Sequence, residues 1–317
     1  MAGSARSMFR SSALPFAVAC VALFGSACGS NDDGAADGTH GAAPPGAGGS
    51  VSGAPSGVPS PSAGAASGVA AASRCKVTAE SVFCTHNVTP LTAGTARRDV
   101  YWQTPLTPAP PGGYPVVVMY QGSFAGPSLT WATLTPSAAF AGFQQGRLQA
   151  MLLDHGFTVI APSAAVGVAW QTNSGIPYDA STDKGVIDAL LAAIEAGQYG
   201  PADKARLYAT GISSGGYMTS RMAVSHEGKF RALAVHSGSY ATCLGSVCNI
   251  PSLPSDHPPT LILQGAKDNL VPIATAQSYH DKLVASGLES TMVVDPMAGH
   301  EWLTVSPERI TDWFSTH

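Results

Sequence analysis

The chain has 317 residues, of which 45% are hydrophobic and only 11% are charged, and its formal net charge is −4. A chain of this composition can bury a large core, and its acidic balance argues against a nucleic-acid partner. The sequence contains no C-x-x-C pair and no H-E-x-x-H motif. We therefore expect no bound metal and no cofactor.

Residues 1–27 have the features of a secretory signal peptide. Two arginines precede the apolar run 13–24, which is shorter than a membrane-spanning helix requires, and small residues stand before Cys28. This pattern suits cleavage by a general signal peptidase. It also resembles the lipid-attachment box of bacterial lipoproteins, although Gly25 stands where leucine is usual. We expect a secreted protein, anchored at the outer membrane surface by a lipid on Cys28.

Residues 28–73 consist almost wholly of glycine, alanine, proline and serine. Such a segment has too few large apolar side chains to offset the entropy lost on ordering, so it is predicted to be a disordered tether. Residues 74–317 have the length of one α/β domain. The tether would separate this domain from the membrane.

Five cysteines follow the predicted signal peptide. Cys75 lies close in sequence to Cys84, and Cys243 to Cys248, so both pairs could form disulfides in an oxidising compartment. Crossed pairing is the alternative. A lipid on Cys28 would account for the odd thiol.

Apolar segments alternate with helical patterns through the predicted domain. This alternation indicates a mostly parallel, doubly wound sheet with helices on both faces. Helices are predicted over 183–196, capped by Ser181 or Thr182, and over 274–285 and 307–314. The predicted strands are 98–102, 115–120, 157–161, 206–210, 232–236, 259–264 and 290–295.

The segment Gly211-Ile212-Ser213-Ser214-Gly215 lies between a predicted strand and a helix-compatible stretch. In a chain rich in glycine and serine this pattern is weak by itself, but between a strand and a helix it is typical of a nucleophile elbow. Ser213 is therefore the candidate nucleophile, with a turn serine as the alternative.

Two further residues follow in the chain order Ser, Asp, His that this architecture requires. Asp268 comes after the strand 259–264, and His300 after the strand 290–295. The imidazole would accept the serine proton, and the carboxylate would orient the imidazole. The alternatives left open are Asp256 and Asp295 for the carboxylate, and His226, His236, His257 and His280 for the base.

An oxyanion formed on a substrate carbonyl would need two donors. The N–H of Ser214 is one candidate. The N–H of Ser123, in the loop after the strand 115–120, is assigned as the other. The sequence thus predicts a serine hydrolase.

The elbow, the loop Tyr120-Gln121-Gly122-Ser123-Phe124, Asp268 and His300 together resemble extracellular polyhydroxyalkanoate depolymerases, especially the medium-chain-length group. The similarity extends from about residue 98 to the C-terminus. The resemblance implies an α/β-hydrolase fold and hydrolysis of ester bonds in bacterial storage polyesters without a cofactor. Short-chain members carry an added polymer-binding domain, whereas this chain ends soon after His300, which favours the medium-chain type.

Substrate contacts are predicted for Gln121, Phe124, Trp170 and Trp302, with core packing as the alternative for the aromatic residues. Segments 124–150 and 163–181 are long enough to form a rim around the site. Two other functions stay open. One is a carbohydrate esterase of the feruloyl or acetyl-xylan type, and the other is a surface binding protein without turnover.

Overall fold

The computed structural model describes residues 72–165, 168–172 and 177–317. These residues belong to one compact unit, Ala66–His317. The predicted signal peptide, Cys28 and all but the last residues of the predicted tether lie outside the described residues. Within the described ranges, no helix combines the length and apolar character needed to cross a bilayer.

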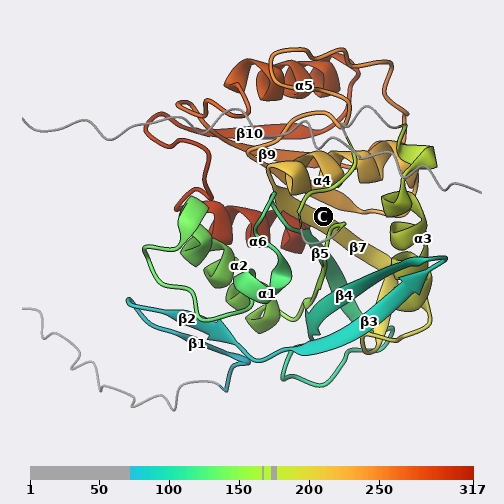
Figure 1. The fold of residues 1–317 in the computed structure, drawn as a ribbon, viewed down its shortest axis with the longest axis vertical. Coiled ribbons are helices and arrows are strands. Elements are labelled where there is room, and N and C mark those ends of the chain that lie inside the picture. The colour runs from blue at the N-terminus through green and yellow to red at the C-terminus, as the bar shows by residue number, and fades with distance from the viewer. Residues whose placement is uncertain (1–71, 166–167, 173–176) are drawn as a thin grey trace, which may run out of the picture. The chain divides into compact units, whose positions relative to one another are not determined.

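An eight-stranded sheet forms the centre of this unit, in the order β10-β9-β8-β7-β5-β6-β4-β3 (Figure 1). Strands β5 to β10 run parallel to one another, whereas β4 pairs antiparallel with β6, and β3 pairs antiparallel with β4 at the edge. The strands are β3 (Asn87–Ala93), β4 (Ala96–Gln103), β5 (Tyr114–Tyr120), β6 (Thr158–Pro162), β7 (Ala202–Ile212), β8 (Ala232–His236), β9 (Thr260–Gly265) and β10 (Ser290–Asp295). All seven predicted strands are confirmed.

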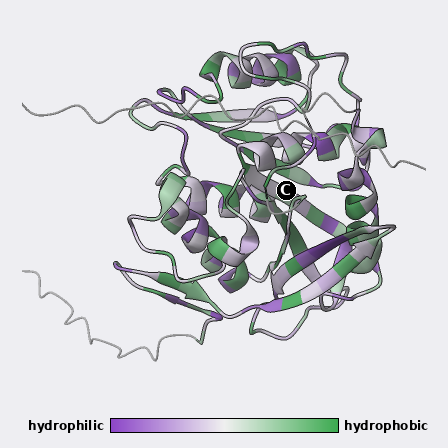
Figure 2. Ribbon diagram, viewed as in Figure 1, coloured by the Kyte–Doolittle hydropathy of each residue, from purple (hydrophilic) through white to green (hydrophobic). Residues whose placement is uncertain are grey.

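Helices cover both faces of the sheet, as the alternation predicted. Strand β5 is buried throughout, and Figure 2 shows it as an apolar ribbon. Its alternate side chains point to opposite faces. Val117 and Met119 pack with helices α2 (Gly142–Asp154) and α6 (Ser306–Thr316). Val116 and Val118 pack with α3 (Thr182–Glu195) and α4 (Ser214–Ser225).

Helix α5 (Ile273–Ala285) lies on the same face as α4. Its Tyr279 and Leu283 pack with Tyr217 of α4 and with Ile262 of β9. The Ser181 side chain accepts a hydrogen bond from the N–H of Lys184 at 3.3 Å and so caps α3, as predicted.

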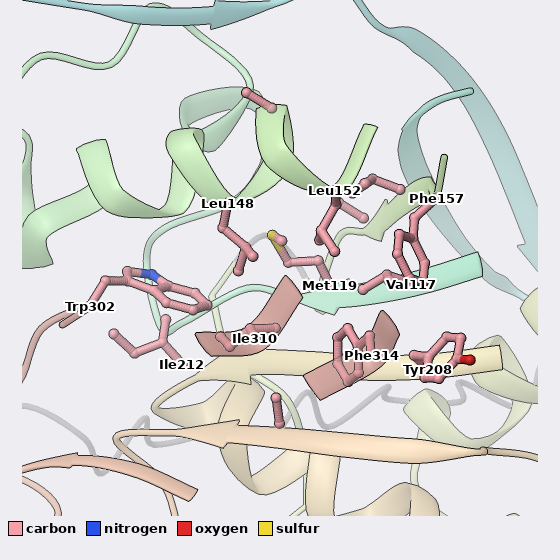
Figure 3. Close-up of a cluster of buried hydrophobic side chains, with 14 of the residues drawn as sticks. Val117, Met119, Leu148, Leu152, Phe157, Tyr208, Ile212, Trp302, Ile310 and Phe314 are labelled. Atoms are coloured by element: carbon pink, nitrogen blue, oxygen red, sulfur yellow. The ribbon is translucent and has the colours of Figure 1, made fainter. Parts of the chain in front are cut away.

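Helix α2 begins within the segment 124–150, which is long enough to form a rim, and continues to Asp154. Its Leu148 and Leu152 point into the core against Met119, Ile310 and Phe314 (Figure 3). The part of the segment that lies in α2 therefore packs into the core. Each such leucine contributes about 1.5–3 kcal/mol by burial, so α2 is a structural layer.

A small hairpin precedes the sheet. It consists of β1 (Cys75–Val77) and β2 (Val82–Cys84), and the disulfide Cys75–Cys84 joins residues that face each other in its register. The second disulfide, Cys243–Cys248, closes the loop after β8. Both pairs form as expected, and the crossed alternative is wrong. Short helical turns at α1 (Pro127–Thr130), η1 (Ala139–Ala141) and η2 (Tyr178–Ala180) complete the unit.

Candidate active site

Ser213 lies between β7 and α4, in the sharp turn that the motif predicted. Its backbone has φ 59° and ψ −122°, a strained conformation for a residue other than glycine. The glycines around it allow close packing, because a Cβ on Gly211 would lie 2.5 Å from the carbonyl oxygen of Tyr120. A Cβ on Gly215 would lie 2.5 Å from that of Gln121. The turn is thus pressed against the end of β5.

Asp268 and His300 meet at the same edge of the sheet, although they lie 32 residues apart. His300 Nδ1 is 2.8 Å from Asp268 Oδ2. The carboxylate also accepts hydrogen bonds from the side chain of Gln264 and from the N–H groups of Leu270 and Val271. Burial opposes ionisation of this carboxyl, but the hydrogen bonds from His300 and the backbone outweigh it and hold the pKa of Asp268 below its usual value.

The loops that carry this pair are fastened to each other. The N–H of Lys267 donates to the carbonyl of Ala298 at 3.0 Å, and the N–H of Ala266 donates to that of Asp295 at 2.8 Å. Gly265 permits the approach, since a Cβ there would lie 2.5 Å from the carbonyl oxygen of Ala298. The position of His300 therefore depends on the backbone of the neighbouring loop.

The loop after β5 lies against the nucleophile turn. A Cβ on Gly122 would lie 3.8 Å from the Cβ of Ser213, so the loop that carries Ser123 packs beside the nucleophile turn. Ser214 follows the nucleophile as the first residue of α4. The two residues predicted to supply oxyanion donors thus belong to the loop after β5 and to the start of α4.

The residues predicted to contact substrate are placed differently from one another. Phe124 is 69% exposed and adopts a left-handed backbone with φ 62°. Gln121 and Trp170 are buried: the Gln121 side chain accepts the N–H of Ala164, and its carbonyl accepts the indole N–H of Trp170. Their burial removes them from substrate and makes them supports of the loop.

Trp302 is likewise buried, with 2% of its surface exposed. Its indole N–H donates to Gln145 of α2, and its backbone N–H donates to the carbonyl of Phe140. Trp302 therefore anchors the loop of His300 to the core and does not present a surface to substrate.

Sequence reasoning missed Phe140 as a site residue. Its side chain is 44% exposed, and its ring meets the ring of His300 edge to face at 6.0 Å between centroids. Phe140 and Ala141 both have left-handed backbones, with φ 54° and 50°. A non-repeating segment gives no periodic signal, so only the pair of positive φ angles marks it. Gln264 was also missed because it ends a buried strand and reads as core.

The competing residues have other partners. Asp295 accepts the N–H of Met297, and His280 lies 2.9 Å from the hydroxyl of Ser290. His226 is next to the hydroxyl of Tyr178, and His257 to that of Tyr279. Among the candidate carboxylates and histidines, Asp268 and His300 are the pair that a hydrogen bond joins in the described part of the chain. The described residues include no group of three or more histidine, cysteine or acidic side chains arranged to hold a metal ion.

A cavity lies elsewhere, where β5 and β7 begin, and basic side chains line it. Arg206 there is paired with Asp203, and Arg231 donates to the backbone carbonyl of His317. Both guanidinium groups are thus engaged within the chain.

The fold and the site geometry define a serine hydrolase with the α/β-hydrolase architecture. The profile of the prolyl oligopeptidase family matches residues 147–244, which include the nucleophile turn. The chain is 47% identical over 260 residues to a poly(3-hydroxyoctanoate) depolymerase of Pseudomonas fluorescens, an alignment that covers 78% of this chain and 92% of the relative. The chain belongs to this depolymerase family.

Two solved structures share the fold at low sequence identity. Dipeptidyl peptidase 4 of Porphyromonas gingivalis is 16% identical with a TM-score of 0.51, over 73% of this chain and 35% of the peptidase. A thermostable esterase is 19% identical with a TM-score of 0.50, over 73% of this chain and 59% of the esterase. This chain thus spans only part of both proteins, and the likeness shows the fold alone.

Proposed function

We propose that this protein hydrolyses ester bonds in polyhydroxyalkanoate-type polyesters through Ser213, His300 and Asp268. One observation carries the proposal: the Asp268–His300 pair forms at the sheet edge where Ser213 occupies its strained turn. Because Asp268 engages Nδ1, Nε2 is the nitrogen left to accept a proton. The 47% identity to a poly(3-hydroxyoctanoate) depolymerase supports the choice of a polyester substrate.

In the first step, Ser213 Oγ forms a bond to the ester carbonyl carbon while its proton moves to His300 Nε2. The N–H groups of Ser123 and Ser214 stabilise the oxyanion. The bond to the leaving alcohol then breaks, and His300 gives the proton to that alcohol. Water then gives a proton to His300 and bonds to the acyl carbon; the bond from that carbon to Ser213 Oγ breaks, Oγ takes the proton back from His300, and the carboxylic acid product leaves.

The exposed rings of Phe124 and Phe140 are the groups we propose to contact the alkyl part of the substrate. Both are large and apolar, and Phe140 meets the base directly. Their exposure in the free protein fits a surface that apolar polymer covers.

Ser213→Ala tests the proposal. Purified wild type and variant are compared on polyhydroxyoctanoate, polyhydroxybutyrate and feruloylated xylan, with circular dichroism to verify folding. We expect the wild type to clear polyhydroxyoctanoate and Ser213→Ala to lose turnover by a factor of about 10⁴ or more.

Other outcomes would change the proposed substrate or contradict the proposed catalysis. Serine-dependent feruloyl release without polyester clearing would make the protein a carbohydrate esterase with the same catalytic residues. Wild-type activity in Ser213→Ala would exclude Ser213 as the nucleophile. A wild-type protein that no fluorophosphonate labels and that turns over no ester would be a surface binding protein.

We further propose that residues 1–27 direct secretion and that Cys28 carries a lipid, with residues 28–73 as the tether to the domain 74–317. The two disulfides of the described domain support an oxidising compartment. Metabolic labelling with a radioactive fatty acid should mark the wild type and leave Cys28→Ala unlabelled. Equal labelling of both proteins would contradict the lipid anchor on Cys28, and retention of the protein inside the cell would contradict secretion.

A further inference from the structure

We propose that the buried side chain of His236 is a positioning residue that fastens the loop of His300 to the turn of Ser213. The proposal rests on the catalytic roles assigned above to Ser213 and His300. His236 is the last residue of β8, which lies in the sheet between β7, the strand before Ser213, and β9, the strand before Asp268.

The backbone of His236 supports the nucleophile. Its carbonyl accepts the N–H of Ser213 at 3.1 Å, one residue beyond the register pair Ile212–His236. A Cβ on Gly216 would lie 2.6 Å from this same oxygen, so the first turn of α4 also packs onto it. The backbone of His236 thus contacts both the strained turn of Ser213 and the first turn of α4.

The ring of His236 supports the loop of the base. The N–H of Leu303 donates to His236 Nε2 at 3.0 Å, so this nitrogen must be unprotonated and the ring proton must be on Nδ1. Nδ1 lies 3.1 Å from the hydroxyl of Ser237, which in turn donates to the carbonyl of Glu301, the residue after His300. The hydroxyl of Ser306 lies 2.8 Å from Nε2 and completes the set.

The ring is neutral as well as buried. Its side chain is fully inaccessible, and it packs against Trp302 at 4.7 Å between ring centroids. Burial and, to a smaller extent, the nearby His300 lower the pKa of His236, while Asp268 opposes them, and the net pKa is about 3. A neutral ring keeps one donor and one acceptor, which is the combination these contacts require. His236 therefore holds the loop of His300 in position and takes no part in proton transfer, which is the role of His300.

The chain offers a matched control in His257. This residue is also buried, and its two nitrogens lie 2.9 Å from the carbonyl of Pro258 and 2.9 Å from the hydroxyl of Tyr279. Burial lowers the pKa of His257 too. Its partners belong to its own loop and to α5, whereas those of His236 belong to the catalytic turns. Loss of either ring should cost stability, but only loss of the His236 contacts should displace His300.

The experiment compares His236→Phe, His236→Gln and His257→Phe in the full-length protein. Phenylalanine keeps a ring against Trp302 and removes the acceptor, whereas glutamine can restore an acceptor. Each variant is assayed for kcat and KM on soluble 4-nitrophenyl octanoate, for the rate of fluorophosphonate labelling of Ser213, and for its thermal midpoint.

We expect His236→Phe to lower kcat and the labelling rate by about 100-fold with little change in KM, the scale of a small misplacement of catalytic groups. His236→Gln should regain at least about tenfold of this loss, and His257→Phe should keep kcat within about twofold while its thermal midpoint falls. If His236→Phe does not fold, Ser306→Ala decides, because it removes one contact to Nε2 and should lower kcat by about three- to tenfold with an unchanged KM.

Equal kcat losses in His236→Phe and His257→Phe would overturn the proposal, because a purely structural role predicts that result. Unchanged kcat in folded His236→Phe or, where that variant fails to fold, in Ser306→Ala would overturn it as well. The Ser213→Ala variant separates this failure from failure of the proposed function. If Ser213→Ala is inactive, Ser213 is kept as the catalytic serine and only the positioning role of His236 is rejected.

Discussion

The two halves of the site are built in different ways. Asp268 and His300 come from short loops after β9 and β10, whose backbones bond to each other and whose side chains are almost wholly buried. The other half, from the loop after β5 to Ala141, is irregular, has several left-handed residues, and exposes Phe124 and Phe140. In the proposed mechanism, the polar half transfers protons and the apolar half contacts substrate. We therefore expect changes in the first half to act on kcat and changes in the second to act on KM and substrate choice.

The largest expected effect is that of Asp268→Asn. An amide would keep the size of the carboxylate, but it would not stabilise a protonated imidazole and would favour the wrong tautomer. We expect kcat on 4-nitrophenyl octanoate to fall by about 10³-fold or more, with KM nearly unchanged. A fall of less than about tenfold in a folded variant would contradict the role of Asp268, and Asp256→Asn is the control.

Gly265→Ala should act on the same half through the backbone. The added methyl group would meet the carbonyl oxygens of Ala298 and Gly299, so the loop of His300 must move. We expect kcat to fall by about 100-fold and stability by about 1–3 kcal/mol. Gly185→Ala is the control: this glycine lies inside α3 with open space around it, and alanine there should stabilise by about 0.5–1 kcal/mol without changing kcat. A wild-type kcat in Gly265→Ala would show that the two loops move independently.

Acid should loosen the polar half before it affects the apolar half. Burial lowers the pKa of His236 to about 3, whereas a histidine in an unfolded chain titrates near about 6.5. The unfolded state therefore binds this proton first as the pH falls. The contribution of His236 to stability is fully present above about pH 6.5 and is lost progressively towards pH 3.

Urea unfolding at pH 7.5, 6, 5 and 4 measures this loss. The wild-type free energy of unfolding should decline more steeply with acid than that of His236→Gln, whose side chain does not titrate. Parallel curves for the two proteins would show that His236 does not carry a lowered pKa.

The smallest effect is expected in the apolar half, from Phe140→Ala. The variant loses an exposed ring beside His300 and leaves the Asp268–His300 bond in place. We expect KM for 4-nitrophenyl octanoate to rise by about three- to tenfold, KM for 4-nitrophenyl acetate to change less, and kcat to stay within about threefold. Val284→Ala, an exposed apolar residue of α5, should change neither value. An equal rise for both esters would show that Phe140 does not contact the alkyl chain.

The same contrast explains what could be predicted from the sequence. The parallel strands are apolar runs bounded by turn formers. Asp268 and His300 each lie in the loop that follows one of these strands, so both could be placed at the same edge of the sheet. The strand–turn–helix context of Ser213 gave its backbone geometry as well. Local patterns therefore sufficed wherever a short loop leaves a buried strand.

Local patterns did not suffice where a side chain's role depends on distant partners. Trp170 and Trp302 lie in turn-rich segments and were predicted to contact substrate, with core packing as the alternative; each is buried, and their indole N–H groups donate to Gln121 and Gln145, which lie far away in the chain. Helix α2 was missed because its apolar residues are interrupted by polar ones such as Gln145, which is itself buried and bonded to Trp302. Phe140 and Ala141 adopt left-handed backbones beside the site, and neither residue type predicts this conformation.

The outer strand β3 has a consequence for how copies of this protein meet. It forms one edge of the sheet, and Pro90 stands in its middle, opposite Asp99 of β4. Proline has no N–H to offer, and within sheets it occurs where that missing donor faces away from the neighbouring strand. A strand from a second molecule would thus find an interrupted ladder at this edge. Two copies are therefore disfavoured from pairing their sheets through β3.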